Sequence, residues 1–161
     1  MRVARAAVAA ILCLTLSACW ARDEREVIRQ RLDAFADAVN TGGGSGLAGA
    51  ATHAIGLANF FTNDVVITLG DGSAPIRGRD MLISMAMRLQ PRTAEYTLDF
   101  EDVNVQLLSD EQSAEVDLTA EFIRREPGAR QSMDAREFKL QMRRDDGEWK
   151  IASVEAIQTL K

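Results

Sequence analysis

Residues that commonly carry out chemistry are scarce in this chain of 161 amino acids, which contains one histidine, one tyrosine and two cysteines. The histidine, His53, has no cysteine, aspartate or glutamate at ligand spacing. The sequence therefore assembles neither a zinc site nor a catalytic triad around it. The glycine-rich run 42–46 lacks the Lys-Ser/Thr ending of a phosphate-binding loop. We expect no metal and no cofactor.

The chain also lacks a basic stripe. Its formal net charge is −5, and most lysines and arginines lie beside carboxylates, as in Arg143-Arg144-Asp145-Asp146. Proteins bind nucleic acids through clustered positive charge that meets the phosphate backbone. An acidic chain without such a cluster is poorly suited to that role, so we expect no nucleic-acid partner.

The apolar stretch Val8 to Leu16 is shorter than the roughly 20 residues that span a bilayer. It follows Arg2 and Arg5 and is followed closely by the polar segment 22–26. A short positive stretch followed by a short apolar one is the layout of a secretory signal. We expect this segment to direct export and not to span the membrane.

Residues 16–19, with the sequence Leu-Ser-Ala-Cys, resemble the lipobox of bacterial lipoproteins. In that family the cysteine receives a diacylglycerol before the signal is cleaved. The resemblance implies a signal peptide over 1–18, a lipidated tether over 19–22 and a folded domain over 23–161. It also implies that Cys19 carries the lipid.

Two alternatives to acylation stay open. Cys19 could be buried or paired with Cys13, although Cys13 lies in the segment that leaves with the signal. Cleavage could also occur near Ala18 or Ala21 without lipid attachment. If Cys19 is acylated, more than one acyl chain anchors the protein stably, and no disulfide is expected. Trp20 stands where lipoproteins of the inner membrane often carry Asp, so the resemblance favours the outer membrane, facing the periplasm, in a Gram-negative host.

Three segments in the first part of the chain predict helices. In the first, which opens at residue 22 or 23, apolar residues recur at spacings of four, three and four: Ile28, Leu32, Phe35 and Val39. The segment 47–61 predicts a second, alanine-rich helix. The segment 79–90 predicts a third helix, which Pro91 ends.

The remaining segments predict strands. Residues 65–69 are rich in β-branched side chains and predict a short buried strand. From residue 94 onward apolar and polar residues alternate, which predicts antiparallel strands, and 145–147 predicts a tight hairpin. The parity of the alternation switches after Phe100, so we expect a β-bulge near Glu101-Asp102.

Two neighbouring strands are expected to carry opposite charges on one face of the sheet. The acidic row is Glu115, Asp117 and Glu121, and the basic row is Lys139 and Arg143, with Arg136 nearby. Opposite charges across a ladder stabilise a solvated sheet face. The same face is a candidate surface for a homodimer or for another recognition partner.

Three pieces of sequence carry a family resemblance. They are residues 60–66 (FFTNDVV), Gly78-Arg79-Asp80 at the start of a helix, and the final hairpin with Trp149. In this order they resemble the nuclear transport factor 2-like superfamily, which includes SnoaL-like polyketide cyclases and ketosteroid isomerase. The resemblance covers about residues 24–160. It implies an α+β, cone-shaped (cystatin-like) fold, in which three N-terminal helices pack on a curved antiparallel sheet and the mouth can hold a small apolar ligand.

The chemistry of the isomerases does not carry over residue by residue. When Asp64 is matched to the opening of the first strand, the position of the general base falls on Leu69. The position of the tyrosine donor falls near Leu32, and that of the protonated aspartate falls near Arg136. Leucine can neither accept nor donate a proton. A shift of two residues would bring in Asp71, which lies in a turn flanked by glycines.

Asp64, Tyr96 and His53 remain as candidate acids or bases. Each also has a structural interpretation: Asp64 caps a helix-to-strand connection, Tyr96 belongs to the core, and His53 is a partly exposed helix residue. The residues expected to line the pocket are Leu32, Phe35, Phe60, Leu69, Met85, Tyr96, Phe122 and Trp149.

These observations favour a membrane-anchored lipoprotein whose domain binds a small molecule, or assembles with a protein, without catalysis. The alternative is a SnoaL-like isomerase, cyclase or hydrolase that acts on a small apolar substrate. Two titratable groups that converge inside a closed cavity would favour the enzyme. A third possibility is a structural envelope protein that forms a homodimer through the curved sheet.

Overall fold

The computed structural model describes residues 23–42, 46–70, 72–88, 95–125 and 131–157. The expected signal, the tether and Cys19 lie outside these residues. In chain order the elements are α2 (Glu24–Thr41), α3 (Gly46–Ala58), β1 (Phe61–Thr68), β2 (Ile76–Arg77), α4 (Arg79–Arg88), β3 (Glu95–Leu107), β4 (Ser113–Arg125), β5 (Ser132–Asp145) and β6 (Glu148–Ala156).

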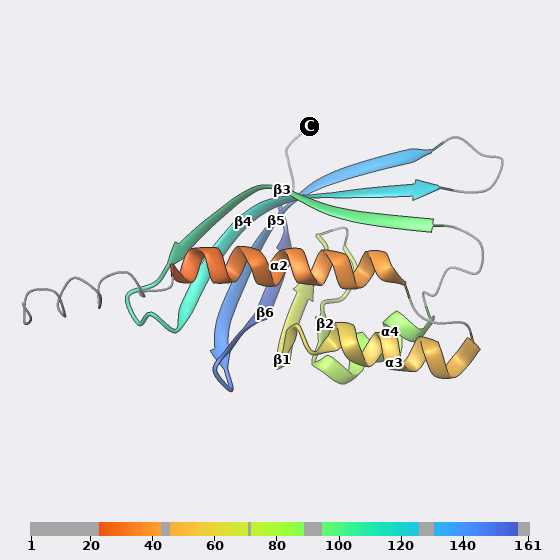
Figure 1. Ribbon diagram of the computed structural model, residues 1–161, viewed down its shortest axis with the longest axis horizontal. Helices are drawn as coiled ribbons and strands as arrows, with labels where there is room; N and C mark the ends of the chain where they lie inside the picture. The colour runs from red at the N-terminus through yellow and green to blue at the C-terminus, as the bar shows by residue number, and fades with distance from the viewer. Residues whose placement is uncertain (1–22, 43–45, 71, 89–94, 126–130, 158–161) are drawn as a thin grey trace, which may run out of the picture.

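Figure 1 shows how these elements form an α+β fold with three described helices and a mixed sheet of six strands. The long helix α2 lies across the curved sheet, and α3 and α4 lie together beneath its C-terminal half (Figure 1). Among the described residues, no helix combines the length and the apolar character needed to cross a bilayer.

Helix α2 confirms the first predicted helix. Asp23 caps it, and the Asp23 side chain accepts a hydrogen bond from the amide of Arg25 at 3.1 Å. Ile28 and Leu32 of its apolar stripe are buried. Gly42 ends the helix with a φ of 69°, a left-handed conformation that glycine adopts without steric cost.

The second helix and the first strand have different limits from those predicted. Helix α3 ends at Ala58, and Phe61 already belongs to β1, where it pairs with Ile151 of β6. The assignment of Phe61 to a helix is therefore wrong, because pairing with a distant strand overrides local preference. Asp64 lies inside β1, at an irregularity between Phe61 and Val66, and so does not cap the connection that precedes the strand.

The strands follow the order β2-β1-β6-β5-β4-β3. Strand β1 pairs with β6 in parallel, and every other pair is antiparallel. The expectation of a purely antiparallel sheet is therefore wrong in one respect. The parallel pair arises because the chain returns from β5 to β6 by a tight turn and then runs alongside its first strand.

The predicted bulge in β3 is confirmed. The register between β3 and β4 shifts between Glu101 and Asn104, and Asp102 has a φ of 53°. The extra residue exchanges the faces of the side chains that follow, so Leu98 before the bulge and Val105 after it both enter the core. The bulge therefore bends a long strand while its apolar residues stay on one side.

The two faces of the sheet differ in character. The inner face packs against α2 and carries the core residues, among them Leu98, Val116, Leu118, Leu140, Met142 and Ile151. The outer face carries the residues between them, including Asp117 and Lys139. This alternation is typical of a sheet with one buried and one solvated face.

The start of α2 is hydrogen-bonded to the β5–β6 hairpin. The carboxylate of Glu24 accepts hydrogen bonds from Arg144 and from the indole Nε1 of Trp149, the latter at 2.8 Å. The hairpin itself turns through Asp146 and Gly147, whose φ values of 54° and 81° confirm the predicted tight turn. The first residues that the structure describes are thus held against the last two strands.

Candidate functional site

Four phenylalanine rings meet on the inner side of the fold. The ring centroid of Phe35 on α2 lies 5.4 Å from those of Phe60 and Phe61, and 6.3 Å from that of Phe100 on β3. The first two pairs meet edge to face, an arrangement that favours packing of the rings. Two predicted pocket residues, Phe35 and Phe60, are therefore brought together, but they pack on one another.

The other predicted pocket residues separate into buried and exposed groups. Leu32 and Trp149 are only 1% and 2% exposed, so they belong to the packed core. Leu69 and Phe122 are 38% and 40% exposed. Met85 on α4 is half-buried. The side chain of Tyr96 lies outside the described part of the structure, so its proposed role stays a prediction.

Asp64 lies on the outer face and does not point into the cone. Its carboxylate pairs with the guanidinium of Arg143 at 2.9 Å, and its side chain is 69% exposed. The hydroxyl of Thr62 and the guanidinium of Arg143 hold the pKa of Asp64 below its usual value. Asp64, one of the three candidate acids or bases, is therefore an ionised partner of Arg143 at physiological pH.

His53 lies on α3 and is half-buried. It makes no hydrogen bond or ion pair within the described residues. The positions that the isomerase comparison singles out also carry no acid or base pair: Leu69 is exposed, Leu32 is buried, and Arg136 pairs with Asp134 at 3.2 Å. Across the described residues, no group of histidine, cysteine, aspartate or glutamate is arranged to hold a metal ion.

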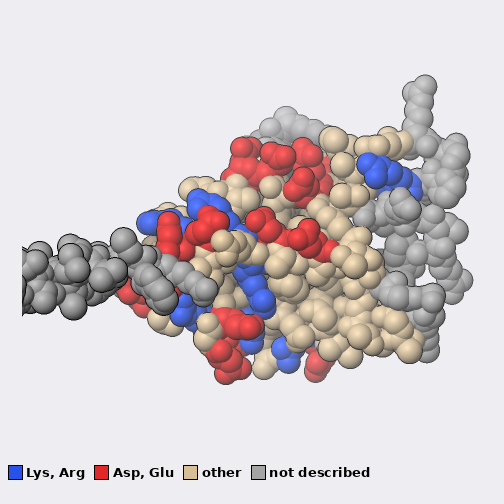
Figure 2. Space-filling view, viewed as in Figure 1, with Lys and Arg blue, Asp and Glu red and all other residues tan. Residues whose placement is uncertain are grey.

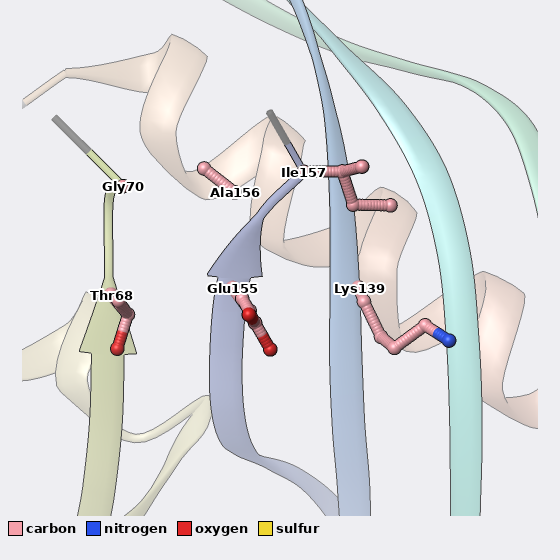
Figure 3. A pocket seen from close by; sticks show the side chains of 6 residues that line it. All are labelled: Thr68, Gly70, Lys139, Glu155, Ala156 and Ile157. Carbon is pink, nitrogen blue, oxygen red and sulfur yellow. The ribbon is translucent and has the colours of Figure 1, made fainter. Parts of the chain in front are cut away.

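A cavity of about 480 Å³ opens on the opposite, outer face of the sheet. Its lining comes from Thr68, Gly70, Lys139, Glu155, Ala156 and Ile157. Figure 3 shows the side chains of Thr68, Glu155 and Lys139 on the neighbouring strands β1, β6 and β5. The cavity lies where the two parallel strands end, since Thr68 is paired with Glu155.

The charged side chain of Lys139 at this outer cavity is open to solvent. The Lys139 ammonium lies 3.6 Å from the carboxylate of Asp117, and both side chains are about half exposed, at 46% and 51%. Such charges are solvated and gain little from their pairing. Electrostatic interactions are stronger in a site that excludes water, and these two groups are not in such a site.

The sequence could not have revealed this cavity. Its residues lie on strands separated by some 90 positions, and the cavity exists because the first and last strands are neighbours. The only local signal was the glycine-flanked turn after Leu69, where Gly70 has a φ of 73°.

The predicted charge rows on the outer face are confirmed in part. Asp117 faces Lys139 across the β4–β5 ladder. Glu115 faces Gln141, and Glu121 faces Ala135, so neither meets a cation directly across the ladder. Arg143 pairs with Asp64 instead.

The third predicted cation, Arg136, stands on the inner-face parity of β5, opposite the buried Ala120. Figure 2 shows acidic side chains gathered over the bend of β3. Asp99, Glu101 and Asp102 contribute exposed carboxylates to that bend. Acidic side chains thus gather at this bend of the sheet.

A comparison with protein families assigns this fold. The model of the SnoaL-like domain matches residues 20–155. The chain belongs to the SnoaL-like family. No curated protein matches its sequence.

Solved structures support the same fold for this SnoaL-like domain. A protein provisionally named a scytalone dehydratase, from Novosphingobium aromaticivorans, has a TM-score of 0.69 and 17% identity, with 85% of each chain covered. Aln2 from a Streptomyces species has a TM-score of 0.70 and 12% identity, with 86% of this chain and 92% of that one covered. An NTF2-like protein with a cystatin-like fold, also from Novosphingobium aromaticivorans, has a TM-score of 0.64 and 15% identity over 92% of this chain and 86% of that one. At these identities the likeness concerns the fold alone.

Proposed function

We propose that this SnoaL-like domain is a non-catalytic binding or assembly module, tethered to a bacterial membrane through an acylated Cys19. One observation carries the non-catalytic part. Asp64, one of the three candidate acids or bases, is turned to the outer face and held by Arg143 at 2.9 Å. Its lowered pKa keeps it ionised and bound to that guanidinium, so it is not available as a base in the cone.

The surroundings of the remaining candidates support the same proposal. His53 has no partner among the described residues that would orient it as a base. The aromatic cluster around Phe35 gives the inner side an apolar character. An apolar inner surface without a converging acid and base favours binding over reaction.

The membrane attachment rests on the sequence Leu-Ser-Ala-Cys at 16–19. We expect metabolic labelling with a fatty acid to mark the protein. The substitution Cys19→Ser should abolish both the label and the membrane fractionation, whereas the matched substitution Cys13→Ser should change neither. Labelling that survives Cys19→Ser would refute the attachment site.

The binding function is tested on protein purified in mild detergent from its own membrane. Native mass spectrometry should detect the mature domain with acyl mass on Cys19 and, in addition, a retained small molecule or a second protein. A retained molecule that is converted with time, and is no longer converted in the variant His53→Ala or Tyr96→Phe, would establish the enzyme instead. A monomer that retains neither small molecule nor protein would refute the binding module.

A further inference from the structure

Helix α4 has an apolar composition but no buried residue. It carries five large apolar side chains: Met81, Leu82, Ile83, Met85 and Met87. None of its ten residues, all of which the structure describes, is buried. Met81 is 54% exposed and Met87 is 38% exposed. A surface helix normally buries its apolar stripe against the protein, so α4 offers apolar surface to something outside the domain.

The neighbouring helix α3 has no charged residue along Gly46–Ala58. Its exposed residues include Thr52, Ile55 and Gly56, which recur at helical spacing, and Ile55 is 52% exposed. The solvent side of a helix in a soluble domain usually carries charges. Helix α3 is in contact with α4 and, like α4, exposes a large apolar side chain.

We call this surface the α3–α4 face and define it by Thr52, Ile55 and Gly56 of α3 and by Met81, Ser84 and Met87 of α4. On α4, the exposed positions 80, 81, 84, 87 and 88 fall within an arc of about 120° at 100° per residue. Figure 2 shows that few charged side chains lie in this region, below and to the right of the centre.

The charges beside the α3–α4 face are mostly positive. Arg77 and Arg88 are exposed, Arg79 is half-buried, and Asp80 is the one carboxylate of β2 and α4. The chain as a whole has a net charge of −5. An apolar surface with arginines at its border suits a surface of anionic lipid, because the side chains of methionine and isoleucine enter the interface while arginine reaches the headgroups.

We infer that the α3–α4 face docks on the same bilayer that holds the acyl chains of Cys19. The inference rests on the lipid attachment proposed above. Four residues lead from Cys19 to Asp23, so the tether spans at most about 14 Å when extended. The hydrogen bonds that Trp149 and Arg144 donate to Glu24 hold the start of α2 against the β5–β6 hairpin. The tether thus keeps the domain at the lipid surface, where even a modest apolar face docks at high effective concentration.

Depth-dependent fluorescence quenching tests the docking on the lipidated protein. The protein is reconstituted into vesicles of phosphatidylethanolamine and phosphatidylglycerol that contain a nitroxide-labelled lipid. One thiol-reactive fluorophore is placed at Ile55→Cys and, in a separate sample, at Met133→Cys. Met133 is a matched control, because it is 61% exposed and lies on the sheet, away from the α3–α4 face. We expect several-fold stronger quenching at position 55 than at position 133.

Two substitutions then test the apolar contact itself. With the fluorophore at Thr52→Cys, the pair Met81→Glu and Met87→Glu should remove most of the quenching, whereas Met133→Glu should leave it unchanged. All variants should still fractionate with membranes, since the acyl anchor is intact. Circular dichroism identical to that of the parent establishes that α4 remains folded.

Several results would overturn the inference. Equally weak quenching at 55 and 133 would place the α3–α4 face in water, and equally strong quenching would show that contact with lipid is not confined to this face. The fluorophore at 55 could instead be shielded from the nitroxide while the protein has twice the monomer mass. This result would assign the face to contact with a second copy of the chain. A fluorophore that reacts with Cys19 of the parent protein would show a free thiol and would refute the lipid attachment, a failure distinct from the preceding ones.

Discussion

The side-chain amide of Asn40 satisfies both backbone polar groups of Leu98. Its Nδ2 donates to the carbonyl of Leu98 at 2.9 Å, and its Oδ1 accepts from the N–H of Leu98 at 2.7 Å. Leu98 lies on β3, which is the last strand in the order of the sheet. Two residues on, the N–H of Phe100 donates to the carboxylate of Asp99 at 2.9 Å. Three backbone groups of β3 are therefore satisfied by side chains, which disfavours pairing of this part of the edge with another chain.

Asn40→Ala should lower the free energy of unfolding by about 1–3 kcal/mol, because two backbone groups beside a buried side chain lose their partner. Chemical denaturation of the variant and the parent measures the loss. Light scattering at rising concentration should also show increased self-association through the uncapped edge. Asn59→Ala, an exposed asparagine after α3, is the control. A loss no larger than that of Asn59→Ala would contradict the role of the amide.

Glu24→Ala should cost about 1–3 kcal/mol, since the buried indole N–H of Trp149 and the half-buried Arg144 lose their shared acceptor. In a Trp20→Phe background Trp149 is the only remaining tryptophan, and its emission should shift to the red as water reaches the indole. Glu26→Ala, two residues along the same helix, removes an exposed contact with Arg29 at 3.9 Å and should cost less than about 0.5 kcal/mol. Equal losses of the free energy of unfolding in Glu24→Ala and Glu26→Ala would refute the role of Glu24 as the shared acceptor.

Asp102→Val should destabilise the domain by about 1–2 kcal/mol, because the φ of 53° at the bulge is unfavourable for a β-branched side chain. Asp102→Gly should be neutral or stabilising, as glycine adopts this conformation freely. Thermal unfolding compares the two variants with Glu101→Val, whose position lies just before the register shift. If Asp102→Val and Glu101→Val unfold alike, the left-handed residue is not what sets the bulge.

Asp110 should make stability depend on pH in the acidic range. Its carboxylate accepts from the N–H of Gln112 at 3.0 Å and from the hydroxyl and N–H of Ser113 at 2.9 Å, and these bonds hold its pKa below 3.8. A carboxyl whose pKa is lower in the folded state contributes stability above its unfolded pKa, and this stability is lost as the pH falls through the folded pKa. Unfolding measured from pH 7 down to pH values below about 3.8 should show this loss in the parent chain and a smaller one in Asp110→Asn. An acid dependence of Asp110→Asn as steep as that of the parent, with Glu111→Gln as control, would contradict the assignment.

Local patterns were enough to predict much of the fold. The stripe of Ile28 and Leu32 indicated α2, and the parity switch after Phe100 indicated the bulge that Asp102 forms. These features depend on neighbours in sequence, because helical and strand periodicities are local properties. The family resemblance, which the SnoaL-like match confirms, added the expectation of helices before a long antiparallel meander.

Features set by distant pairing were not predictable in the same way. Asp64 was one of three candidate acids or bases, and the predicted strand began only at residue 65, whereas β1 begins at Phe61 and its pairing is irregular between Phe61 and Val66. That irregularity turns Asp64 toward Arg143, a partner 79 positions away. The segment 79–90 was predicted as a helix, but the exposure of its apolar residues was not predicted. Their helical spacing indicates an apolar stripe but does not say whether protein or another medium covers it.

The parallel pairing of β1 with β6 joins the first strand of the sheet in chain order to the last one. Phe61 meets Ile151, so the first strand has no neighbour on that side until almost the whole chain has been made. Closing so long a loop is entropically costly and slows folding. A chain that ends before Glu148 would leave β1 joined only to the two residues of β2 and would leave β5 as a bare edge. The complete sheet is therefore expected to form in one cooperative step, late in synthesis. Incomplete chains would expose unpaired strands and would depend on other proteins to prevent their aggregation.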